Sequence, residues 1–217
     1  MKILLHICCG PCAIMPIKRL QDEGHEVTGL FYNPNIHPLA EYLRRREGAA
    51  QVADRYGIKV IWATEDADYN TVNWLHMIHG QEDTRCGLCW NQRIERSYNV
   101  AVNNGFDAFT SSLLYSRYQQ HDFIAKRAAE LAGAVTPNSA ALPVAAALPA
   151  VAPAVVTPAS TKSPCKFYYK DFRTDWQAGI DISKEWGVYR QPYCGCILSE
   201  NERYTKALKR ENQKLKI

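Results

Sequence analysis

Before residue 133, short apolar runs alternate with longer amphipathic segments along this chain. Residues 3–7 are apolar apart from one histidine and predict a short buried strand. Residues 13–23 carry apolar side chains at helical spacing and stop at a glycine, which predicts a helix. The stretch EVTGLFYNPN then predicts a second strand that ends in a Pro/Asn turn, and residues 39–56 predict a charged amphipathic helix.

The same alternation continues through the next segments. Further strands are predicted for IKVIWAT and FDAFTSSLL, and further helices for residues 69–79, 90–104 and 121–132. Strands that alternate with helices of about ten or more residues pair in parallel, with helices on both faces of one sheet. We therefore expect an α/β fold whose functional sites lie at the carboxyl ends of the strands.

The composition changes sharply in residues 133–164, which are almost uncharged and dominated by Ala, Pro and Val. The apolar part is shorter than the roughly 20 residues of a membrane helix and contains prolines. We interpret residues 133–164 as an extended linker inserted into a single domain of residues 1–217. The alternative is a surface-docked, partner-binding segment. Beyond it, KFYYKDF predicts another strand, and residues 201–217 predict a basic helix that either contacts nucleic acid or is simply solvated.

The overall composition suits one soluble domain. The 217 residues are 47% hydrophobic, and 26 Lys+Arg against 22 Asp+Glu give a net charge of +4, which permits a polyanionic partner such as nucleic acid. No signal peptide is recognisable, so we expect a cytoplasmic protein without a membrane segment. Thiols stay reduced in the cytosol, and the eight cysteines are then better explained as metal ligands or redox groups than as structural disulfides.

Seven of the cysteines fall into three groups. These are Cys8, Cys9 and Cys12 in CCGPC, Cys86 and Cys89 in RCGLCW, and Cys194 and Cys196 in YCGC, whereas Cys165 stands alone. A C-x-x-C pair on a turn that leads into a helix presents two thiolates to one metal near the positive end of the helix dipole. Four thiolates from the first two groups suit zinc or an iron-sulfur cluster, and adjacent cysteines fit a zinc knuckle poorly.

Other interpretations of the cysteines remain open at this point. Cys9 and Cys12 form a C-G-P-C dithiol before a helix, as in a thiol-disulfide oxidoreductase, and a non-catalytic, metal-stabilised RNA-binding module is a further alternative. The cysteines could also merely fill the core. Cys194 and Cys196 could form a strained, readily reduced disulfide, act as additional metal ligands, or be inert thiols.

Several longer motifs resemble one known family, the QueH-type epoxyqueuosine reductases. The matching stretches are HICCGPC, GLFYNPNIHP, EYLRRR, DTRCGLCWNQRIE, FTSSLLYSRYQQHDFI, YYKDFRTDWQAGIDISKE and YRQPYCGCILSE. The resemblance implies reduction of epoxyqueuosine to queuosine at the wobble position of a tRNA anticodon, the final step of queuosine biosynthesis, with an external electron donor. It also implies a Rossmann-like sheet of the HUP (nucleotide α-hydrolase-like) type, with a metal cluster at the carboxyl ends of its strands.

The family's functional residues transfer to named positions of this sequence. The resemblance implies a 4Fe-4S cluster on Cys8, Cys9, Cys86 and Cys89, a redox-active disulfide between Cys194 and Cys196, and an additional mononuclear iron for which Cys12 is a candidate ligand. From their positions after predicted strands, we expect the base-binding pocket to include Tyr32, Asn33, Asn35, His37 and Arg117. Of Arg44, Arg45 and Arg46, helical geometry lets only one or two face phosphate.

Overall fold

A parallel sheet forms the centre of the computed structural model, which describes residues 1–63, 69–133 and 165–215. Its strands follow the order β3-β2-β1-β4-β5 and all pair in parallel. They are β1 (Lys2–His6), β2 (Glu26–Phe31), β3 (Lys59–Trp62), β4 (Ala108–Ser111) and β5 (Lys166–Phe167). The predicted α/β fold with a parallel sheet is confirmed.

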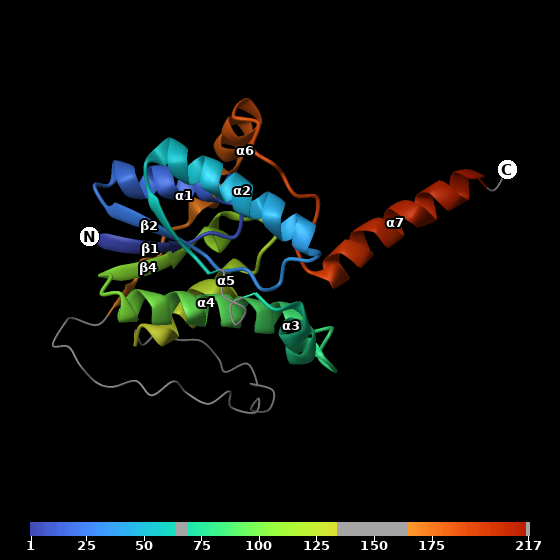
Figure 1. Cartoon of the computed structure of the whole chain (residues 1–217), viewed down its shortest axis with the longest axis horizontal. Coiled ribbons are helices and arrows are strands. Elements are labelled where there is room, and N and C mark those ends of the chain that lie inside the picture. The colour runs from blue at the N-terminus through green and yellow to red at the C-terminus, as the bar shows by residue number, and fades with distance from the viewer. Residues whose placement is uncertain (64–68, 134–164, 216–217) are drawn as a thin grey trace.

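Helices cover both faces of this sheet (Figure 1). Helices α1, α2 and α6 lie on one face, α4 and α5 lie on the other, and α7 projects away from the body. The bounds are α1 (Gly10–Asp22), α2 (Leu39–Tyr56), α3 (Thr71–Ile78), α4 (Arg85–Asn103), α5 (His121–Leu131), α6 (Trp176–Glu185) and α7 (Ile197–Leu215), with two short 3-10 helices, η1 (Ser112–Tyr115) and η2 (Phe172–Asp175). None of these described helices combines the length and the apolar character that crossing a bilayer requires.

Some predicted boundaries differ from the observed ones. The strand expected over 106–114 ends at Ser111, because the Ser111 side chain accepts a hydrogen bond from the Leu113 amide and starts η1. The strand expected over 166–172 pairs only at Lys166–Phe167, and η2 follows. Helix α4 begins earlier than the expected residue 90, and α6 was not predicted. The linker assigned to 133–164 lies, from residue 134 on, outside the described residues.

The central strand fixes the position of the first cysteine group. Ile3, Leu4 and Leu5 of β1 are completely buried between the two helical layers, as expected for the middle of a parallel sheet. The chain leaves β1 after His6 and enters α1 at Gly10, so the first cysteines occupy the turn between them. A Cβ atom on Gly10 would lie 2.3 Å from the carbonyl oxygen of Gly48, and glycine therefore lets α1 start close against α2.

Candidate metal centre

The turn between β1 and α1, together with the first turn of α1, gathers three sulfur atoms. The Sγ atoms of Cys8, Cys9 and Cys12 all lie within 4.8 Å of one another, close enough for the described residues to hold a metal ion. The Cys8 amide donates to Ser112 Oγ at 3.0 Å, and Ser112 Oγ donates to Cys8 Sγ at 3.3 Å. Gln191 Nε2 donates to Cys9 Sγ at 2.9 Å. Two of the three sulfurs, those of Cys8 and Cys9, are thus held by side chains that are distant in the sequence.

The pKa values of these three cysteines shift in different directions. Hydrogen bonds from Cys12, Cys9 and Ser112 hold the pKa of Cys8 well below its ordinary value. Burial raises the pKa of Cys9, and hydrogen bonds with Cys8 and Cys9 raise that of Cys12. Because metal ligation requires thiolates, binding of a metal to all three sulfurs would release protons.

The other two cysteine groups face the same cavity, which has a volume of about 630 Å³. The cysteines in its lining are Cys8, Cys12, Cys86, Cys194 and Cys196. The lining also includes residues that follow β1, β2 and β4, so the cavity lies at the carboxyl ends of the strands, as parallel α/β sheets lead us to expect.

Helix α4 supplies the second group at its amino-terminal end. Cys86 is exposed and Cys89 is buried, and burial raises the pKa of both thiols, that of Cys89 to about 12. Both positions lie at the positive end of the α4 dipole, which favours a bound anion or thiolate. Cys9 and Cys89 do not line the cavity, so grouping Cys8, Cys9, Cys86 and Cys89 around one cluster stays a prediction.

The third group occupies a tight turn before α7. Cys194 is exposed, Cys196 is buried, and both are free thiols. The φ angle of the intervening Gly195 is 138°, a conformation that favours glycine, and a Cβ there would lie 3.1 Å from Arg45 Nη1. The amide of His37 donates to the Gly195 carbonyl oxygen at 2.8 Å, which fixes this turn against the loop after β2.

Only part of the predicted base pocket lines this cavity. Asn33 and Asn35 do, and Asn33 Nδ2 donates to the Ile7 carbonyl oxygen at 2.9 Å. Tyr32 is buried outside the lining, and His37 packs against Trp74 with ring centroids 4.9 Å apart. A position after a strand determines the edge of the sheet but not the direction of the side chain, which explains these placements.

Arg117, the fifth residue of the predicted pocket, also lies outside the cavity lining. Its guanidinium lies over the Trp176 ring, 5.7 Å from the centroid, and Trp176 itself lines the cavity. Substrate contact by Arg117 therefore stays a prediction. The same holds for Tyr32 and His37.

Arg93 is a residue of the site that the sequence analysis missed. It lines the cavity and is 3% exposed, its Nε donates to the Cys89 carbonyl oxygen at 3.2 Å, and its Nη2 has no hydrogen-bond partner among the described residues. Burial opposes its charge, yet electrostatic interaction with Cys89, Cys194 and Cys8 raises the pKa of Arg93. A buried cation without a carboxylate partner indicates an anionic occupant nearby. Its spacing from Cys86 and Cys89, seven and four residues, could have revealed the shared helix face.

Arginines and aromatic rings make up much of the remaining lining. The arginines are Arg45, Arg85, Arg93, Arg190 and Arg203, and the aromatic residues are Trp90, Tyr115, Tyr118, Trp176 and Tyr193. Among the described residues of this lining, Glu202 is the one carboxylate, and it forms an ion pair with Arg85. The cavity is therefore positively charged and suits an anionic, aromatic ligand.

His6 holds the strand ends below the cavity together. Its Nε2 lies 3.0 Å from the Tyr32 carbonyl oxygen and its Nδ1 lies 2.9 Å from Ser111 Oγ, which joins the carboxyl ends of β1, β2 and β4. Burial lowers the pKa of His6 to about 4, so the ring is neutral near pH 7 and can donate with one nitrogen and accept with the other. In the sequence, the feature that could have indicated this role is a histidine within an otherwise apolar strand.

Sequence comparisons identify the family to which the chain is similar. A sequence model of the family described as "Epoxyqueuosine reductase QueH" matches residues 3–139 and 150–202. A protein of that name from Histophilus somni is 34% identical over 212 residues, which cover 91% of this chain and 72% of that protein. Another from Acinetobacter baylyi is 32% identical, covering 91% of this chain and 80% of its own length, and one from Dehalococcoides mccartyi is 29% identical, covering 94% and 96%.

Proposed function

This chain belongs to the epoxyqueuosine reductase QueH family, a family of oxidoreductases, and on that premise we propose that it reduces epoxyqueuosine to queuosine in tRNA. The observation that carries the proposal is the single cavity that collects cysteines from three distant segments next to the buried cation of Arg93. Reductive chemistry needs redox groups, and thiolates grouped in this way are the ligands and electron carriers that proteins use.

The residues fit an iron-sulfur cofactor. We assign a 4Fe-4S cluster to Cys8, Cys9, Cys86 and Cys89, and a further iron to a site that includes Cys12, whose sulfur lies within 4.8 Å of those of Cys8 and Cys9. Thiolates are the usual protein ligands of such clusters, and the uncompensated guanidinium of Arg93 suits their negative charge. The bound cluster would supply electrons one at a time.

Cys194 and Cys196 complete the electron balance. Converting an epoxide to an alkene consumes two electrons and two protons and releases water. Oxidation of the two thiols to a disulfide releases two electrons and two protons, so one turnover leaves a disulfide that an external thiol or protein reductant must reduce. Cys194 is exposed, which leaves this pair accessible to such a donor.

The rim of the cavity suits a nucleobase turned out of an RNA loop. Tyr118 is 84% exposed and packs edge-on against Trp176, 5.6 Å between ring centroids, and both line the cavity. Exposed aromatic rings and arginines stack on unpaired bases. Asn33 and Asn35 lie deeper and offer amide groups for polar atoms of the base. By contrast, Cys9 is only 1% exposed, which argues against a dithiol exchanging with protein disulfides.

The test begins with anaerobic reconstitution of the full chain with iron and sulfide. We expect about four sulfides and four irons per chain plus one more iron, a paramagnetic signal on reduction, and conversion of epoxyqueuosine to queuosine in tRNA. Binding of zinc alone, or a fully loaded protein that leaves the epoxide unchanged under a strong reductant, would reject the proposal.

A further inference from the structure

A stripe of basic side chains follows one face of α7. Arg203, Lys206, Arg210 and Lys214 are three or four residues apart, which places them in line along a helix, and all are exposed. The first three form no ion pair with any described residue, while Lys214 pairs with Glu211 at 2.8 Å. We call these four residues the basic stripe.

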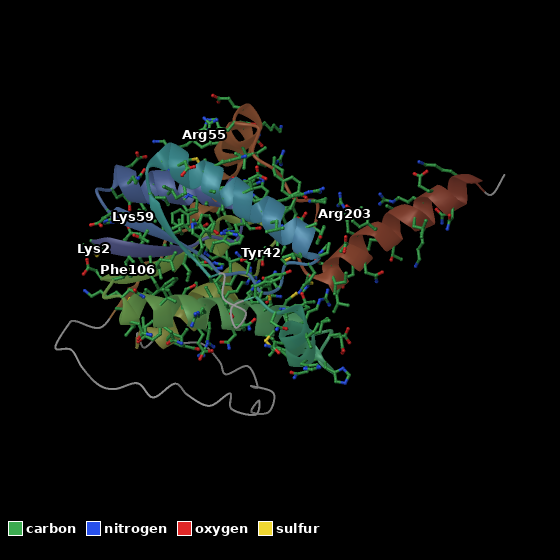
Figure 2. The ribbon with its side chains drawn as sticks, in the orientation of Figure 1. Lys2, Tyr42, Arg55, Lys59, Phe106 and Arg203 are labelled. Carbon is green, nitrogen blue, oxygen red and sulfur yellow. The ribbon has the colours of Figure 1, made fainter. Side chains whose placement is uncertain are left out.

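The basic stripe starts at the cavity and leads away from it. Arg203 lines the cavity and lies where α7 leaves the body (Figure 2). The base of α7 is held there by the ion pair between Arg85 and Glu202 and by the Glu200 amide, which donates to the Cys196 carbonyl oxygen at 3.0 Å. At about 1.5 Å per residue, the stripe extends about 17 Å outward.

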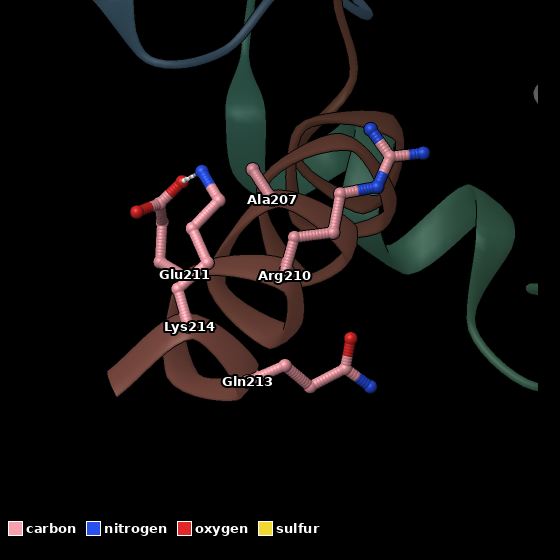
Figure 3. A pocket seen from close by; sticks show the side chains of 5 residues that line it. All are labelled: Ala207, Arg210, Glu211, Gln213 and Lys214. Atoms are coloured by element: carbon pink, nitrogen blue, oxygen red, sulfur yellow. Dashed lines mark hydrogen bonds and ion pairs between the residues drawn. The ribbon is translucent and has the colours of Figure 1, made fainter. Parts of the chain in front are cut away.

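The outer part of α7 presents its side chains to solvent. Figure 3 shows Arg210, Gln213 and Lys214 extending from the helix, with Lys214 paired to Glu211. Figure 1 shows no other labelled element beside this end of the helix. Arg203, Lys206 and Arg210 form no ion pair with any described residue, so this projecting face suits a partner that supplies negative charge.

We propose that the basic stripe binds the phosphate backbone of the anticodon arm while the target base occupies the cavity. The inference rests on the proposed function, because it takes tRNA as the substrate. Regularly spaced cations fit a polyanion, and the stripe continues the positive charge of the cavity. The family match ends at residue 202, so the stripe is not a feature on which the family assignment depends.

The opposite face of α7 argues against an anionic membrane as the partner. Tyr204 and Leu208 are 50% and 61% exposed, and Glu200 and Glu211 lie beside them at helical spacing. Carboxylates next to the apolar face would repel anionic lipid headgroups. On the basic face, Lys214 pairs with Glu211, whereas Arg203, Lys206 and Arg210 form no ion pair with any described residue, which favours a polyanion that contacts that face.

The test measures binding of the full-length chain to a synthetic, unmodified anticodon stem-loop RNA over a range of salt concentrations. Replacing all four stripe residues (R203Q, K206Q, R210Q and K214Q) should weaken binding about tenfold or more and reduce the slope of log affinity against log salt by about three. Glutamine has a helix propensity close to that of lysine and arginine, and R203K/R210K should retain binding.

A matched control removes four charges elsewhere: K2Q, K59Q, K166Q and K184Q. All four lysines are exposed, and Lys2, Lys59 and Lys166 begin strands, at the edge of the sheet away from the cavity. Figure 2 shows Lys2 and Lys59 on the side of the molecule opposite Arg203. This control should bind RNA with unchanged affinity and salt slope.

Three outcomes would overturn the stripe proposal: wild-type affinity in the stripe variant, equal losses in the stripe and control variants, or no RNA binding by the wild-type chain. Turnover on tRNA carrying epoxyqueuosine is measured in parallel. If the wild-type chain reduces the base but the stripe variant binds RNA normally, only the stripe proposal fails. If the stripe carries RNA binding but the loaded wild-type chain never reduces the base, only the proposed function fails.

Discussion

Arg45 on α2 donates a hydrogen bond from Nη1 to the carbonyl oxygen of Cys194 at 2.8 Å. Its Nη2 donates to the Tyr193 carbonyl oxygen at 3.1 Å, and its Nε donates to Glu41 Oε1 at 2.7 Å. Glu41 in turn accepts from the Tyr189 hydroxyl at 2.6 Å. One buried ion pair on α2 therefore holds the segment that carries the exposed thiol of the third cysteine group.

The first prediction concerns this arginine. Arg45→Gln leaves the buried Glu41 carboxylate without its cation, and we expect a loss of about 3–5 kcal/mol in the free energy of unfolding. The loosened turn should also let Cys196, which is 6% exposed, react faster with an alkylating reagent. Arg44→Gln is the matched control, because Arg44 is exposed on the same helix. Equal stability and equal thiol reactivity in both variants would contradict this role of Arg45.

The second prediction concerns the close contact between α1 and α2. Gly10→Ala puts a Cβ 2.3 Å from the Gly48 carbonyl oxygen. The two atoms can separate only if the backbone of α1 or α2 shifts, so we expect a destabilisation of about 1–3 kcal/mol. In the control Gly87→Ala, the nearest atom is Phe123 Cζ at 3.9 Å, and the helix should gain up to about 1 kcal/mol. Denaturant unfolding of both variants measures the difference; a neutral Gly10→Ala would refute the steric argument.

Much of the fold could be predicted because local pattern and tertiary position agree. Each of the five strands was expected within a few residues, since apolar runs between amphipathic helices leave few other arrangements. Helix α6 escaped prediction because packing determines it: a Cβ on its Gly179 would lie 2.2 Å from the Tyr115 hydroxyl oxygen, so the glycine that weakens the helical pattern lets the helix pack there. Sequence propensity contains no information about that contact.

The candidate site could be predicted only in part. Cysteine spacing identified three groups, each of which contributes at least one cysteine to the lining of one cavity, because parallel strands end at a common edge. The contact from Arg45 to Cys194 joins residues 149 positions apart, and no local pattern reveals it. Arg93 was missed for a different reason: its spacing places it on the helix face of Cys86 and Cys89, but a helical arginine is usually solvated, and its burial is visible only in the structure.

The third prediction tests the role of Arg93. Removing a cation near thiols raises their pKa, so Arg93→Gln should shift the apparent thiol titration of the metal-free chain upward by about one unit, measured by thiolate absorbance. The same variant should retain less iron and sulfide after reconstitution. Arg93→Lys should preserve part of both properties, and Arg96→Gln, exposed on the same helix, should preserve them fully. A titration unchanged in Arg93→Gln would show that its charge does not act on the cysteines.

The fourth prediction separates ligands from structural thiols. Cys86→Ala should lose most of the reconstituted iron and sulfide, because Cys86 lines the cavity at the start of α4. Cys165→Ala is the matched control: Cys165 is buried, does not line the cavity, and burial raises its pKa to about 11. Iron analysis and visible absorbance of both variants provide the measurement. A full complement of iron in Cys86→Ala would remove this residue from the ligand set.

The fifth prediction concerns acid sensitivity and His37. Burial lowers the pKa of His37 from 6.5 to about 4, so between these values the unfolded chain takes up a proton that the folded chain excludes. The free energy of unfolding should therefore fall as the pH falls from about 6.5 towards 4. In His37→Phe, the ring still packs against Trp74 but no longer titrates. The free energy of unfolding should then change less steeply with pH, by at most the slope that the uptake of one proton causes. His6, with the same direction of shift, keeps some acid sensitivity in both proteins. Denaturant unfolding at several pH values gives both curves, and parallel curves would show that His37 titrates normally in the folded protein.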